Sequence, residues 1–206
     1  MHVLRWPAIL ICLIGAVALF LILFQYSTPD TPAAGRAEIG GAFTLIGTQG
    51  QIIKDGDFRG KLMLVYMGYS NCPNICPMTL STLSRVLALL GNEANKVAAI
   101  FITLDPARDT PQVLAKYLGG FDARIIGLTG AESEILKTVQ AYKAYSEKIT
   151  PPHADGYLID HSGFIYLMDR NGQYLTHFQP GAKAEQIAEV VRAVLKEEDE
   201  RGWMIR

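Results

Sequence analysis

A pair of cysteines four positions apart, Cys72 and Cys76, lies between a continuous apolar run at residues 62–67 and a helical pattern at residues 80–90. The apolar run is typical of a strand that is buried on both faces of a sheet. Pro77 directly follows the second cysteine and suits the first turn of a helix, where its missing N–H is not needed. The chain must therefore fold so that both thiols lie at the junction between a buried strand and a helix.

The order of the remaining predicted elements sets the fold class. Strands alternate with helices after residue 39, and a hairpin with an Asn-Gly turn at Asn171 and Gly172 follows them. Further strands are expected at residues 43–46, 52–53, 97–104, 125–128, 164–168 and 174–178, and further helices at residues 111–118, 132–145 and 184–196. This order predicts an α/β fold with a mixed sheet, helices on both faces and an N-terminal β-hairpin. A cysteine pair at the first strand-to-helix junction of such a sheet is a thioredoxin-like arrangement.

Residues 8–24 contain no charged side chain. As a helix over about residues 7–26, this segment would reach about 30 Å, which is the thickness of a bilayer core. Trp6 and Tyr26 bracket it as interfacial anchors, and Arg5 precedes it, which places the N-terminus in the cytoplasm and the rest outside. We therefore expect one transmembrane helix in the inner (cytoplasmic) membrane, with the soluble part on the periplasmic side. A cleaved signal peptide is the alternative, although no clear cleavage site follows the apolar run.

Composition and charge indicate how the chain is divided into parts. We expect a membrane anchor at residues 1–26, a flexible tether rich in Ser, Thr, Pro, Ala and Gly at residues 27–38, and one domain at residues 39–206. The formal net charge of −1 and the 19% of charged residues do not fit a nucleic-acid-binding protein or a disordered chain.

The two thiols leave two kinds of chemistry open. The C-x-x-x-C spacing of Cys72 and Cys76 differs from the C-x-x-C of a thioredoxin redox centre, but it does not forbid a disulfide. The N-terminus of a helix lowers the pKa of a nearby thiol and so favours the thiolate, which both attacks disulfides and binds metals. Two thiolates are too few for a closed zinc site, whereas they suit a soft ion such as Cu(I). A third ligand would be a histidine or methionine from elsewhere.

Among the four histidines, His161 is the main candidate for that third ligand. It lies just before the strand at residues 164–168, and in a thioredoxin-like sheet this segment passes close to the redox loop. Spacing alone leaves open whether His161 is a ligand or a structural histidine. His177 is expected on the surface or at a sheet edge, His153 in solvent, and His2 on the cytoplasmic side.

At these residues the chain resembles the Sco (SenC) family of membrane-anchored copper chaperones. The resemblance extends from about Gly41 to the last helix, and the occurrence of C-P-x-x-C-P together with a later D-H-S makes it specific. The segments that carry it are MGYSNCPNICP at residues 67–77, ITLDPARDTP at residues 102–111, GLTG at residues 127–130 and YLIDHS at residues 157–162.

The resemblance implies a thioredoxin-like domain in which Cys72, Cys76 and His161 jointly bind one copper ion, as Cu(I), Cu(II) or both. It also implies a role in building the binuclear copper-A centre of cytochrome c oxidase, by delivering copper, by reducing the receiving cysteines, or by both. The partners would be the oxidase subunit that carries this centre and an upstream copper donor or thiol reductant. Asp160 is a candidate to orient the imidazole, or else a turn residue.

Two rival functions remain beside the chaperone. In a thiol-disulfide oxidoreductase, one cysteine of the Cys72/Cys76 pair attacks a partner disulfide and the other resolves it. A thiol peroxidase would need a resolving cysteine outside this loop, and the sequence offers none in the expected domain. The chain is therefore expected to be a copper chaperone rather than an enzyme, with thiol-disulfide reductase activity left open. The segment at residues 105–111 is interpreted as a loop and helix cap rather than a docking site.

Overall fold

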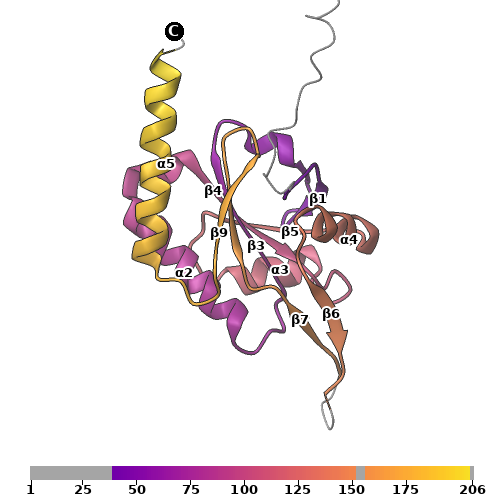
Figure 1. The fold of residues 1–206 in the computed structure, drawn as a ribbon. Helices are drawn as coiled ribbons and strands as arrows, with labels where there is room; N and C mark the ends of the chain where they lie inside the picture. The colour runs from indigo at the N-terminus through magenta and orange to yellow at the C-terminus, as the bar shows by residue number, and fades with distance from the viewer. Residues whose placement is uncertain (1–38, 152–155, 205–206) are drawn as a thin grey trace, which may run out of the picture. The chain divides into compact units, whose positions relative to one another are not determined.

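A computed structural model of the chain describes residues 39–151 and 156–204 (Figure 1). The elements, in chain order, are β1 (Thr44–Gly47), β2 (Ile52–Lys54), η1 (Asp55–Phe58), β3 (Leu62–Gly68), α2 (Ile75–Leu90), η2 (Gly91–Lys96), β4 (Val97–Thr103), α3 (Pro111–Leu118), β5 (Ile125–Thr129), α4 (Glu132–Ala141), β6 (Ser146–Ile149), β7 (Leu158–His161), β8 (Ile165–Met168), β9 (Tyr174–Phe178) and α5 (Ala184–Met204). In these ranges no helix has both the length and the apolar character needed to cross a bilayer. The segment expected to do so, about residues 7–26, lies outside them.

The main sheet has seven strands in the order β2-β1-β5-β4-β3-β8-β9. β3, β4 and β5 run parallel to one another, whereas β1 and β8 are antiparallel to their neighbours β5 and β3. Every residue of β3 and β4 is buried, as the continuous apolar runs predicted. The sheet is therefore mixed, and the cysteine-bearing loop leaves the C-terminal end of a central strand.

Helices cover both faces of this sheet. α2 and α5 pack side by side on one face (Figure 1). α3 lies on the same face, because its Tyr117 packs on Phe101 of β4, which in turn packs on Tyr66 of β3, with ring centroids 6.1 and 5.9 Å apart. On the opposite face, Tyr142 at the end of α4 packs on Tyr166 of β8 at 5.4 Å. The predicted three-layer architecture and both predicted hairpins are thus confirmed.

Two helix ends differ from the prediction, whereas the start of α2 agrees with it. α2 begins at Ile75, so its first turn contains Pro77, as expected, together with the second cysteine. α4 ends at Ala141, four residues before the predicted end, because Lys143 has a positive φ of 51° that a helix cannot accommodate. α5 continues to Met204, well beyond residue 196.

A second, two-stranded sheet was not predicted at all. β6 and β7 pair antiparallel, with Ser146 opposite His161 and Ile149 opposite Leu158. In Figure 1 this ribbon extends from the edge of the domain beside α3. It carries the candidate histidine on its second strand.

Candidate metal centre

The structure brings the three predicted ligands together. Their ligand atoms, the Sγ atoms of Cys72 and Cys76 and a ring nitrogen of His161, all lie within 4.8 Å of one another. Both cysteines are free thiols. The buried strand β3 delivers the chain to the loop, and the first turn of α2 then carries Cys76 into the core at 0% exposure, whereas Cys72 in the loop is 8% exposed.

The imidazole of His161 comes from β7, 85 residues further along the chain. Its Nε2 lies 3.5 Å from the Sγ of Cys76, and its Nδ1 lies 3.0 Å from the backbone carbonyl oxygen of Ser162. Since a carbonyl oxygen only accepts, Nδ1 carries the proton in the neutral ring and Nε2 presents its lone pair to the thiols. The Ser162 carbonyl therefore orients the imidazole, the role considered for Asp160, which is exposed.

The two thiols are inequivalent electrostatically. Hydrogen bonding from Cys76, and further from the backbone N–H groups of Cys76 and Asn74, holds the pKa of Cys72 well below its usual range. The same hydrogen bond to Cys72, together with burial, raises the pKa of Cys76. Of the two sulfurs, the more exposed one therefore favours the thiolate form. The N-terminus of α2 adds a favourable dipole at the same place.

Aromatic rings wall the site on the side of the core. Tyr69 meets the His161 ring edge-on at 5.9 Å, and its hydroxyl oxygen accepts the backbone N–H of Ile159 at 3.1 Å. Tyr66 lies on β3 with its ring centroid 6.4 Å from that of His161. Burial, followed by the nearby Cys76, raises the pKa of Tyr66, so its phenol keeps its proton. Neither tyrosine was predicted to line the site.

Gly68, the last residue of β3, is required by the close approach of the thiol. A Cβ placed there would lie 2.7 Å from the Sγ of Cys76 and 3.0 Å from the ring of Phe101. The sulfur therefore fills the space that a side chain at this position would occupy. Any larger residue would push the sulfur away from the imidazole.

A buried carboxylate holds the cysteine loop. Asp109 is 0% exposed, and its carboxylate accepts the backbone N–H of Ser70 at 3.0 Å, the Ser70 hydroxyl, and the Thr103 hydroxyl at 2.6 Å. Its own carbonyl accepts the Thr129 hydroxyl at 2.8 Å. The segment interpreted as a loop and helix cap is thus also a structural anchor for the loop that carries Cys72.

A second buried carboxylate from the same segment holds the histidine strand. Asp105 accepts the Tyr157 hydroxyl at 2.7 Å and pairs with Arg108, whose Nη1 donates to the Tyr157 carbonyl at 3.0 Å. The guanidinium also lies over the Tyr157 ring, 3.8 Å from its centroid. Tyr157 directly precedes β7, so these contacts fix the start of the strand that ends at His161.

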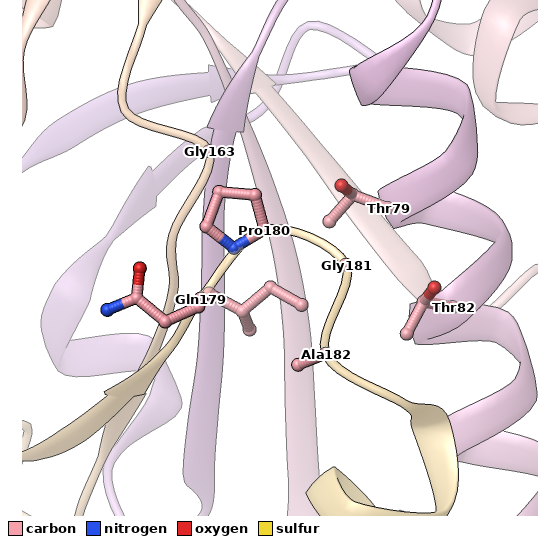
Figure 2. Close-up of a pocket in the computed structure, with 8 residues that line it drawn as sticks. Thr79, Thr82, Gly163, Gln179, Pro180, Gly181 and Ala182 are labelled. Atoms are coloured by element: carbon pink, nitrogen blue, oxygen red, sulfur yellow. The ribbon is translucent and has the colours of Figure 1, made fainter.

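The residues after His161 are packed against the turn between β9 and α5. Figure 2 shows Pro180 beside Gly163, with Thr79 and Thr82 of α2 facing the same small pocket of about 10 Å³. A Cβ on Gly163 would lie 3.0 Å from the Pro180 ring and 3.6 Å from Ile75. This contact limits how far the His161 segment can shift toward α2.

Among the residues that the structure describes, one further histidine, His177, does not join this site. His177 lies on β9, where it contacts the Tyr174 hydroxyl at 2.6 Å through Nδ1 and packs edge-on against Phe164 at 4.7 Å. Its predicted position in a sheet strand is confirmed. His2 and His153 lie outside the described residues.

The fold and these side chains define a class of protein: a thioredoxin-like domain in which two thiols and one imidazole converge at the N-terminus of a helix. The family model described as SCO1/SenC matches residues 31–196, and the chain belongs to that family.

Individual relatives agree with this membership. A SCO2-like protein of Rickettsia prowazekii is 38% identical over 188 residues, covering 87% of this chain and 91% of the relative. Protein SenC of Rhodobacter capsulatus is 39% identical over 162 residues, covering 79% and 73%. Among solved structures, copper-bound ScoI of Bradyrhizobium japonicum is 39% identical with a TM-score of 0.71, covering 76% of this chain and 99% of that one. Copper-bound yeast Sco1 is 34% identical with a TM-score of 0.71, covering 78% and 90%.

Proposed function

We propose that the chain is a copper metallochaperone whose cargo is held by Cys72, Cys76 and His161. The observation that carries this proposal is the convergence of the three ligand atoms within 4.8 Å. Two thiolates favour Cu(I), and an imidazole nitrogen accepts either oxidation state. The copper-bound structures of ScoI and Sco1 support copper as the cargo.

In this proposal the chain serves the assembly of the copper-A centre of cytochrome c oxidase, by delivering copper, by reducing the receiving cysteines, or by both. Residues 1–26 anchor it in the inner membrane, residues 27–38 tether the domain, and residues 39–206 work on the periplasmic side. The partners are the oxidase subunit with the copper-A site and a copper donor or thiol reductant. Cys72 is the more exposed thiol, so ligand exchange with an acceptor starts there.

The test is the amount of copper that the protein retains. The full chain, reduced and kept anaerobic in mild detergent, is loaded with Cu(I) and dialysed against a graded chelator. We expect one tightly bound copper per chain, and a loss of affinity of at least about 100-fold for His161→Ala, since partners that only orient a ligand already contribute 10–100-fold.

His177→Ala is the matched control, because it also removes a strand histidine packed against aromatic rings. It should retain copper as the unaltered chain does. Copper retention that is indifferent to His161, or no retention at all, would contradict the chaperone proposal.

A thiol-disulfide oxidoreductase is the second candidate, favoured by the free, adjacent cysteines and by the lowered pKa of Cys72. His161→Ala separates the two functions, because disulfide exchange needs the thiols and not the metal ligand. If His161→Ala loses copper but keeps most of its rate of disulfide exchange, copper binding requires the imidazole and disulfide exchange does not.

A further inference from the structure

The hydroxyl of Tyr66 is buried beside the metal centre without a hydrogen bond. Tyr66 is 0% exposed, and among the residues that the structure describes its hydroxyl has no hydrogen-bond partner. A buried hydroxyl without a partner is costly, and native structures rarely retain one without a reason. Phenylalanine would fill the same volume on β3 without that cost.

The neighbours of this hydroxyl point to its use. It lies beside Cys76 and Thr79. Thr79 already donates its own proton to the carbonyl of Ile75 at 2.8 Å. Because Gly68 has no side chain, Tyr66 and the Cys76 sulfur can approach each other. A Cβ built on Gly68 would lie 2.7 Å from the Cys76 Sγ and 3.2 Å from a ring carbon of Tyr66.

We propose that the Tyr66 hydroxyl donates a hydrogen bond to the Cys76 sulfur when copper is bound, and thereby raises the preference of the site for Cu(I) over Cu(II). Tyr66 is then a positioning residue and not a ligand. The inference rests on the proposed function, because it concerns the same copper site.

The physical reason is the charge left on the sulfur. A thiolate bound to Cu(II) gives more of its electron density to the metal than a thiolate bound to Cu(I). A hydrogen-bond donor stabilises the sulfur that keeps more negative charge, so it favours the Cu(I) form. Hydrogen bonds around a cysteine sulfur are a recognised means of tuning copper sites, and such partners change affinity by about 10–100-fold.

A thiolate that binds one copper ion keeps further lone pairs, so the Cys76 sulfur can accept a hydrogen bond from the Tyr66 hydroxyl while it holds the metal.

The experiment compares Tyr66→Phe with Tyr117→Phe in the full chain. Tyr117 is a matched control, because its hydroxyl is also buried and has no hydrogen-bond partner among the described residues, and its ring stands one phenylalanine further from the sulfur. Each variant is loaded separately with Cu(I) and Cu(II). The readouts are both dissociation constants by chelator competition, the sulfur-to-copper charge-transfer absorption of the Cu(II) form, and the melting temperature without metal.

For Tyr66→Phe we expect the ratio of Cu(I) to Cu(II) affinity to fall about tenfold, and the charge-transfer band to move to longer wavelength because the sulfur donates more strongly. The metal-free melting temperature should not fall, since no hydrogen bond is lost. Tyr117→Phe should match the unaltered chain in the band and in the affinity ratio.

Two results would overturn the inference. One is an unchanged band and affinity ratio in Tyr66→Phe. The other is a fall in the ratio of Cu(I) to Cu(II) affinity by the same factor in Tyr66→Phe and Tyr117→Phe, which would indicate general loosening of the core. Failure of the proposed function is a different result, since then the unaltered chain itself would retain no copper.

Discussion

The metal centre has two halves that are built differently: a dithiol half, formed by β3, the cysteine loop and α2, and an imidazole half, formed by β6 and β7. β3 has a strand on each side and is buried along its whole length, and α2 packs against α5. Within the described part of the chain β7 pairs only with β6, and a single residue of that two-stranded sheet, Ile159, is buried. The thiols are therefore fixed by the core, whereas the imidazole depends on a few polar contacts near the surface.

One short segment connects the two halves. Asp109 binds the cysteine loop through Ser70, and four residues earlier Asp105, with Arg108, binds Tyr157 at the start of the histidine strand. If the halves differ as described, changes in this segment should separate the stability of the domain from the affinity for copper.

The largest effect is expected for Asp109→Ala. The change leaves the Ser70 and Thr103 donors without their acceptor in a buried place. It should reduce the free energy of unfolding by roughly 3–5 kcal/mol, because each buried donor left unpaired costs about 1–3 kcal/mol. Chemical denaturation of the metal-free chain measures this loss. Asp122→Ala is the control, since Asp122 pairs with Arg124 near the surface and should contribute no more than about 1 kcal/mol.

An intermediate effect is expected for Arg108→Ala. The variant loses the ion pair with the buried Asp105 carboxylate, the bond to the Tyr157 carbonyl and the stacking on the Tyr157 ring. The free energy of unfolding should fall by about 2 kcal/mol, since water that enters the space left by the partly exposed arginine solvates the Asp105 carboxylate. Copper affinity should fall about tenfold, because the strand that carries His161 loses its clamp.

The rate of disulfide exchange by Arg108→Ala tests whether the two halves of the site are independent. Exchange of a small disulfide by the cysteine pair should stay within about twofold of the unaltered rate, since the dithiol half keeps its bonds to Asp109 and loses a distant contact of 5.9 Å between the Arg108 guanidinium and the Tyr69 ring. Equal losses of copper affinity and exchange rate would show that the two halves are not separable. Arg124→Ala, at an exposed ion pair, controls for the loss of a positive charge.

The smallest effect is expected for Tyr157→Phe. It removes the hydrogen bond to Asp105 but keeps the ring under Arg108. The expected loss is about 1 kcal/mol of unfolding free energy, with copper affinity changed by less than about threefold. Isothermal titration and chemical denaturation measure the two quantities. A loss of copper affinity as large as that of Arg108→Ala would show that the Tyr157 hydroxyl, rather than the Arg108 guanidinium, holds the start of β7 in place.

The same contrast explains how much of the molecule the sequence predicted. The dithiol half was predictable because its apolar run, prolines and helical spacing are local signals, and Pro77 lies in the first turn of α2 as expected. The ribbon of β6 and β7 was missed, because residues 142–145 continue the apolar spacing of α4 and β6 is polar and exposed. His161 emerged as a candidate from its position before a strand, but neither the Ser162 carbonyl nor the Asp105 clamp has a local signature.

The separation of the ligands along the chain bears on the order of assembly. The contact between Cys76 and His161 closes a loop of 85 residues, whereas β3, α2 and β4 are consecutive. Because closing a long loop costs more entropy than pairing neighbours, we expect the imidazole to arrive late in folding. In a partly folded chain the two thiols then lack the imidazole, and they can be oxidised or can bind another metal. The thiols are therefore most reactive during folding, until the sheet of β6 and β7 packs against the rest of the domain.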